Sequence, residues 1–172
     1  LFMPQKNIIA YVSLIPRGTI AGIRAWGKRE GTSFRVMLIR DSRIHKEFAP
    51  EGLDIPLESD FSKPDKIAEA LLPYQKQLLA ISCRSESHME WFAKVIPHVP
   101  YLRAPTAASI HWATDKLLMR RRLRVFDKKL IPAFTRVHAN TKKERARIAE
   151  KIGFPLVIKP ANLAQSMLVS LC

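Results

Sequence analysis

Short apolar runs alternate with helical segments over the first hundred residues, and this alternation constrains the fold more than any other feature of the chain. Parallel strands need long crossover connections, which are usually helices, so the pattern predicts a doubly wound parallel α/β sheet. Pro56 interrupts one run and cannot donate to a sheet ladder, so that run is expected at an edge, whereas residues 7–15 and 78–83 are expected to be buried strands. The expected strands are residues 7–15, 33–42, 52–59 and 78–83, and the expected helices are residues 16–31, 62–77 and 85–99.

The character of the sequence changes near Tyr101–Pro105. Residues 104–129 predict two successive helices, the first capped by Thr106 and the second by Thr114 or Asp115, because short polar side chains satisfy the free amides of a helix start. In the second helix we expect Met119, Leu123 and Phe126 to face inward. We place a domain boundary here, so that residues 1–103 form one domain and residues 104–172 form another.

Three further elements are expected in the second domain. Residues 130–137, LIPAFTRV, follow a turn and predict a strand. A helix capped by Asn140 or Thr141 should end at Gly153, a residue type that favours helix ends. The closing stretch, GFPLVIKPANLAQSMLVSLC, predicts a buried strand at 154–158, then a loop and a second strand.

The positive charge of the chain belongs to its last third. The formal net charge is +14, and residues 101–172 hold 15 Lys and Arg against 4 Asp and Glu, whereas residues 1–100 hold 14 against 11. Such an excess indicates either a site for a polyanion or an acidic remainder that complements it.

Lys159 directly follows the expected strand at 154–158. A charged ammonium beside a buried strand is costly unless it reaches water or an anion. A lone lysine at such a position usually extends its stem to water. The next segment favours an anion instead, since the backbone amides of residues 161–166 and the Ser166 hydroxyl can approach the same ligand.

Lys116 lies in the first turn of a predicted helix. A positive charge there opposes the helix dipole, so by itself this lysine reads as a solvated surface residue. A helix start that carries a lysine is also well suited to a phosphate.

Taken together, these stretches resemble the ATP-grasp superfamily over about residues 101–170. The matching pieces are APTAASIHWATDKLLMRRRL, LIPAFTRV and TKKERARIAEKIGFPLVIKPANLAQSMLVS. The resemblance implies that Lys116 and Lys159 bind ATP phosphates and that Ser166 is a polar position of the phosphate-covering loop. It also implies a Rossmann-like parallel-sheet pre-domain, residues 1–103, followed by helices and the first α/β lobe of an ATP-grasp fold within residues 104–172.

The activity that this resemblance implies is ATP-dependent ligation of a carboxylate to an amine or similar nucleophile through an acyl-phosphate. The implied partners are ATP, magnesium and small-molecule carboxylate and amine substrates, and a homodimer is compatible with them. The adenine-binding hinge, the acidic metal ligands and a late arginine of the family would follow Cys172. We therefore expect the chain to be an N-terminal fragment of such a ligase that does not catalyse by itself.

The loop at residues 161–168 departs from the family pattern. Ala164 and Leu168 stand where glycine is common. Without glycine the backbone is less free to adopt a positive φ and close over a phosphate.

Two other classes of function compete with the ligase. The stretch MRRRLRVFDKK could be a nucleic-acid-binding helix, with Arg120, Arg121, Arg122 and Arg124 on phosphates. A solvated helix face explains it better, because no recognised nucleic-acid motif and no aromatic interleaving accompany it. A free-standing α/β domain that binds a small ligand or a protein is the other alternative.

Several classes are excluded or disfavoured. Five scattered histidines show no metal-ligand spacing, and Cys83 and Cys172 are too few for a disulfide framework, so both are expected as reduced thiols, with Cys83 a small core residue. No apolar run reaches the roughly 20 residues that span a bilayer. Together with the absence of a signal-peptide pattern, this leads us to expect a cytoplasmic protein.

Overall fold

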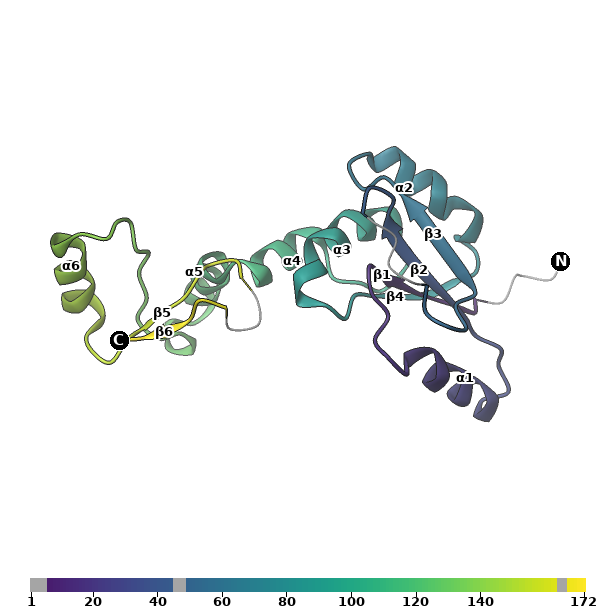
Figure 1. Cartoon of the computed structure of the whole chain (residues 1–172), viewed down its shortest axis with the longest axis horizontal. Coiled ribbons are helices and arrows are strands. Elements are labelled where there is room, and N and C mark those ends of the chain that lie inside the picture. Colours follow the sequence, from purple (N-terminus) through teal and green to yellow (C-terminus); the bar gives the residue numbers. More distant parts are fainter. Residues whose placement is uncertain (1–5, 45–48, 164–166) are drawn as a thin grey trace. The chain divides into compact units, whose positions relative to one another are not determined.

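The computed structural model describes residues 6–44, 49–163 and 167–172. The chain divides into two compact units, residues 1–110 and 111–172, and the division falls within helix α4, Ala107–Thr114 (Figure 1).

The first unit contains a four-stranded parallel sheet with the strand order β3-β2-β1-β4. The strands are β1 (Ile8–Val12), β2 (Arg35–Asp41), β3 (Ile55–Ser59) and β4 (Leu78–Ser82). All three pairings are parallel, which confirms the fold class expected from the alternating pattern. The strand that carries Pro56 lies at an edge, as its missing amide hydrogen requires.

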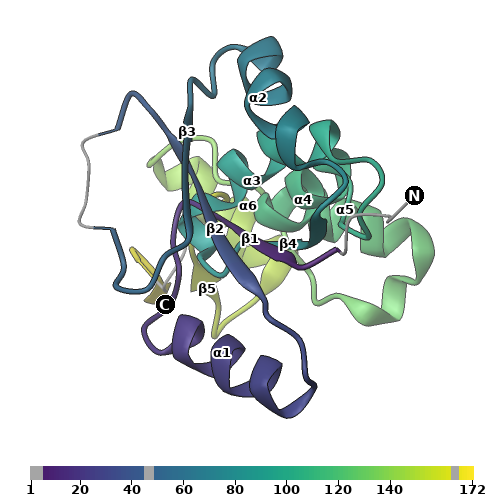
Figure 2. The same ribbon diagram turned by 90° about the vertical axis from the view of Figure 1, so that its right-hand side faces the viewer.

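Helices cover both faces of this sheet (Figure 2). Helix α1 (Thr19–Arg29) packs on one face, and α2 (Pro64–Leu71) and α3 (Met89–Val95) pack on the other. Successive side chains of β2 point to opposite faces, so Met37 joins the α2–α3 cluster and Leu38 joins the α1 cluster. Burial on both faces of the sheet explains why the central residues of β2, Val36–Ile39, are continuously apolar. Short 3₁₀ turns extend the helices at Leu72–Tyr74, Glu86–His88 and Ile96–His98.

One expectation for this unit was wrong and another is confirmed. Residues 78–83 were expected as a buried strand, but β4 lies at the second edge of the sheet and Leu79 is 41% exposed. An edge strand has a neighbour on one side alone, and in this one Leu78 and Ile81 are buried while Leu79 and Ala80 between them are exposed. Cys83 is buried as a core residue, and its burial raises the pKa of its thiol.

The second unit contains α5 (Lys116–Phe126), a 3₁₀ turn at Lys128–Leu130, α6 (Lys142–Ile152) and an antiparallel pair of short strands. The pair is β5 (Val157–Ile158) with β6 (Ser170–Leu171). Both predicted helix starts are present: the Asp115 carboxylate accepts from the amides of Leu117 and Leu118, and the Thr141 hydroxyl accepts from the amide of Glu144.

Three expectations for this unit were wrong. Residues 130–137 form no strand, because in the described part of the chain no other strand pairs with them. The strand at 154–158 is not buried: Leu156 alone is inside, while Val157 is 56% exposed, since a two-stranded ribbon has too little cover. In α5 no residue is buried, and Phe126 is 84% exposed.

No helix among the described residues is both long and apolar enough to cross a membrane.

Candidate anion-binding site

The start of α5 is tied to the loop that follows Lys159. Asp115 caps the helix, and hydrogen bonds from the backbone amides of Leu118 and Leu117 lower the pKa of its carboxyl. The next residue, Lys116, donates its backbone N–H to the carbonyl of Ala161 at 2.9 Å and its ammonium to the carbonyl of Leu163 at 2.6 Å. Residues more than forty positions apart are thereby held together.

A hollow of about 840 Å³ opens beside this junction. Its walls come from α5, residues 132–137, α6, β5 and residues 159–161, and they are mainly apolar. Among the described residues, four cationic side chains and no acidic side chain line it: Lys116, Arg120, Arg136 and Lys159.

Lys116 and Lys159, two residues selected from the sequence, line this same hollow. Lys159 is exposed, and its ammonium makes no hydrogen bond or ion pair within the described residues. An ammonium has three N–H donors, so Lys116 keeps two after its bond to Leu163. The arrangement can therefore bind an anion against an apolar wall.

The third residue selected, Ser166, lies outside the described residues. Leu168, which was expected to restrict the loop, adopts φ 55° and lines the hollow. This left-handed conformation, unusual for a leucine, means that the missing glycine did not prevent a positive φ at this position.

Sequence reasoning missed two members of the site. Arg120 lies one helical turn after Lys116 on the same face of α5, and that i,i+4 spacing was an available signal. Arg136 belongs to the segment mistaken for a strand, where no local pattern indicated the hollow.

A compact network fixes that segment against α6. Arg147 donates to Glu144 at 2.6 and 2.8 Å, to the Thr135 hydroxyl at 3.1 Å and to the Arg136 carbonyl at 2.8 Å. Glu144 also accepts from the backbone amide of His138 at 3.0 Å. The bonds from Arg147 and His138 lower the pKa of Glu144 to about 2. Together these bonds hold residues 135–138 in place without strand pairing.

The described residues do not fit a magnesium site. They contain no group of three or more His, Cys, Asp or Glu side chains that could hold a metal ion. Of the carboxylates in the second unit, Asp115 caps α5 and Glu144 binds Arg147.

Comparison with known proteins shows which solved structure has a similar fold. No protein-family model matches the chain, and no curated protein matches it. Among solved structures, an L-amino acid ligase from Bacillus licheniformis aligns with a TM-score of 0.60 at 16% sequence identity. The alignment covers 98% of this chain and 39% of the ligase, so the chain spans about two fifths of that protein. At this identity the likeness concerns the fold alone, which is mixed α/β with a parallel sheet.

Proposed function

We propose that the chain is the N-terminal part of an ATP-grasp ligase that joins a carboxylate to an amine or similar nucleophile at the expense of ATP. The observation that carries the proposal is that Lys116 and Lys159 line one hollow, which no acidic side chain of the described part of the chain lines. The ligase-like fold supports it independently. Residues 1–103 would be the pre-domain and residues 104–172 the first part of the ATP-grasp domain.

In this proposal the two lysines bind and neutralise the phosphates of ATP. A carboxylate oxygen of one substrate attacks the γ-phosphorus, ADP leaves, and an acyl-phosphate forms. The nitrogen of the second substrate then attacks the acyl carbon, and phosphate leaves. The contribution of Lys116 and Lys159 is electrostatic, because phosphoryl transfer depends mainly on positioning and charge stabilisation. Magnesium is expected from the family alone.

The arginines named for the nucleic-acid alternative make contacts within their own chain. The guanidinium of Arg122 lies 4.0 Å from the centroid of the Trp112 ring. Those of Arg120 and Arg124 lie 5.6 and 5.9 Å from the centroid of Phe134. Three of the four arginines thus contact aromatic rings of their own chain.

The experiment that tests the proposal is a comparison of ATP binding by calorimetry in three variants. Lys159→Met keeps most of the apolar stem and removes the charge, and the loss of one charge-assisted contact should weaken ATP binding about ten- to a hundredfold. Lys142→Met is the matched control, because Lys142 is exposed in the first turn of α6 and does not line this hollow. Lys116→Met should weaken binding in the same direction as Lys159→Met.

The ligase reaction itself is tested in a protein that carries this chain together with the rest of an ATP-grasp domain. ATP-dependent phosphate release would be assayed across pairs of carboxylate and amine substrates, beginning with L-amino acids. Thermal melts control for folding. Unchanged ATP use by a folded Lys159→Met variant would refute the phosphate role of Lys159.

A further inference from the structure

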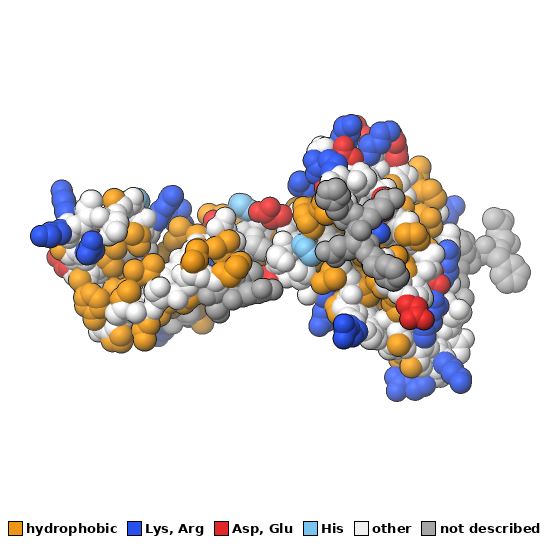
Figure 3. Space-filling view, viewed as in Figure 1, with side chains coloured by type: hydrophobic (Ala, Val, Ile, Leu, Met, Phe, Trp, Pro, Cys, Tyr) orange, Lys and Arg blue, Asp and Glu red, His pale blue; other side chains and the backbone are white. Residues whose placement is uncertain are grey.

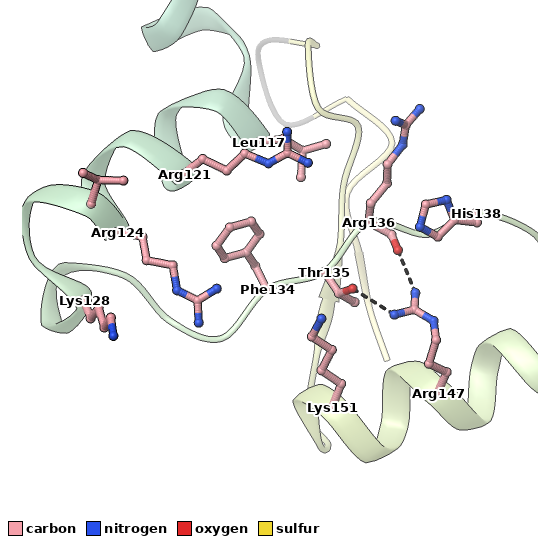
Figure 4. A pocket seen from close by; sticks show the side chains of 11 residues that line it. Leu117, Arg121, Arg124, Lys128, Phe134, Thr135, Arg136, His138, Arg147 and Lys151 are labelled. Atoms are coloured by element: carbon pink, nitrogen blue, oxygen red, sulfur yellow. Dashed lines mark hydrogen bonds between the residues drawn. The ribbon is translucent and has the colours of Figure 1, made fainter.

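A second hollow in residues 111–172 is more strongly cationic than the first (Figure 4). It measures about 750 Å³ and is lined by α5, residues 134–138 and α6, with Phe134 on its wall. We call it the Phe134 hollow. None of the described acidic side chains lines it, and the cationic side chains that do are Arg121, Arg124, Lys128, Arg136, Arg147 and Lys151.

The charges of this hollow are largely uncompensated. Arg147 is paired with Glu144, whereas the other five cations make no ion pair with any described residue. Figure 3 shows lysine and arginine side chains gathered around the part of this unit that carries α6. Five like charges around one hollow repel one another, and a multiply charged anion placed among them removes that repulsion.

The geometry favours phosphoryl groups. Arg124 approaches from α5 and Lys151 from α6, with Phe134 between the two helices (Figure 4). Guanidinium groups present a planar fork that matches phosphate oxygens, and lysines add point charges. The network of Arg147 and Glu144 fixes the backbone of residues 135–138 against α6, so this wall of the hollow is formed before any ligand arrives.

We propose that the Phe134 hollow is a second anion site, distinct from the one that holds Lys116 and Lys159, and that it takes a compact anion carrying two or more phosphoryl groups. The proposal does not depend on the ligase activity, because neither lysine of the first site lines this hollow. The two hollows share residues 134–136 as a common wall, so an anion in one lies next to residues that line the other.

The test uses the 172-residue chain and inorganic tripolyphosphate as the probe. Calorimetry at constant ionic strength would compare the chain with Arg124→Gln/Lys151→Gln and with Lys142→Gln/Lys143→Gln. Both double variants remove two charges, but Lys142 and Lys143 line neither hollow. We expect the first pair to weaken tripolyphosphate binding at least tenfold and the second to weaken it less than about threefold.

A Lys159→Met background separates this site from the proposed nucleotide site. The tenfold effect of Arg124→Gln/Lys151→Gln should persist there, and backbone amide shifts in nuclear magnetic resonance should move at Val125, Lys128 and Lys151 on titration. Shifts confined to Lys116, Lys159 and Ala161 would overturn this proposal while supporting the proposed function.

Three other outcomes would also overturn the proposal. Equal weakening by the two double variants would show that overall charge, not the hollow, attracts the anion. Orthophosphate or sulfate binding as tightly as tripolyphosphate would show that the site does not recognise linked phosphoryl groups. A short single-stranded oligonucleotide that binds more tightly, through Arg124 and Lys151, would make the hollow a nucleic-acid surface.

Discussion

Glu144 ties α6 to residues 135–138, and this role makes its stabilising effect depend on pH. Its pKa is about 2 in the folded chain, below the ordinary value of 4.5, because Arg147 and the amide of His138 favour the charged form. A carboxyl whose pKa is lowered by folding stabilises the fold fully above its unfolded pKa and loses that effect as the pH falls toward the folded value.

We therefore predict that Glu144→Gln lowers the free energy of unfolding above pH 4.5, and that this difference shrinks as the pH falls from 4.5 to about 2. Chemical denaturation of the wild type and of Glu144→Gln across this pH range measures the difference in unfolding free energy. A difference that stays constant with pH would show that the charge of Glu144 does not contribute.

Lys116 and Lys159 are predicted to differ in their effect on stability even though both line the first hollow. Lys116→Met removes the bond to the Leu163 carbonyl and should cost about 1 kcal/mol. Lys159→Met removes no bond within the described residues and should change stability by less than about 0.5 kcal/mol. Thermal melts of the two variants decide this, and equal destabilisation would contradict it.

At the scale of elements, α1 offers a matched pair of glycines. A Cβ at Gly27 would lie 2.4 Å from the Thr32 carbonyl oxygen, whereas a Cβ at Gly22 would meet nothing within 4 Å. Gly27→Ala should therefore destabilise the first unit by more than about 1 kcal/mol through overpacking, while Gly22→Ala should stabilise it by up to about 1 kcal/mol through helix propensity. Equilibrium unfolding measures the stability of both variants. Stabilisation by Gly27→Ala would show that the backbone turn after α1 moves to accommodate the added methyl group.

The N-cap of α5 links helix stability to the candidate site. Asp115→Ala removes both bonds to the amides of Leu117 and Leu118 and should cost about 1 kcal/mol. Because Lys116 is the first residue of α5, fraying of this turn should also weaken ATP binding. Asp115→Asn retains an accepting oxygen and is the control. If the Asp115→Ala variant bound ATP as tightly as the wild type, the N-cap of α5 would not contribute to ATP binding.

At the scale of the whole molecule, the two units differ in how much apolar surface they bury. The fully buried side chains belong to the first unit, while in the second the described buried residues are Ile148 and Leu156. Figure 3 shows exposed hydrophobic side chains over the part of the second unit that carries β5 and β6. In these strands Val157 is 56% exposed and Leu171 is 76% exposed.

Limited trypsin digestion should therefore cut first at Lys128 and Lys129, which are exposed in the short 3₁₀ turn that follows α5. The domain boundary expected from the sequence, near residues 101–105, should resist trypsin, because Tyr101, Leu102 and Ala104 pack against the core of the first unit. A stable fragment that retains residues 6–110 is expected, and mass spectrometry identifies it. Early cuts at Arg84 or Lys94 would contradict this difference between the units.

The success of sequence reasoning depended on how far apart the interacting groups lie along the chain. Asp115, Thr141 and Gly153 act on residues two to four positions away, and the helix ends they predicted are present. The alternation of runs predicted the parallel sheet, because crossover geometry follows from chain connectivity.

The sequence by itself thus determined the fold class and the two lysines as candidates. Only the tertiary structure decided which side chains are buried and which distant residues come together. Residues 130–137 lack a strand and Val157 is exposed, because pairing and cover require a neighbour that local pattern cannot supply. Arg136 reaches the first hollow, and Lys151 reaches the Phe134 hollow, because Glu144 and Arg147 hold distant segments together. Such convergence depends on packing between elements, which propensity and spacing along one segment do not specify.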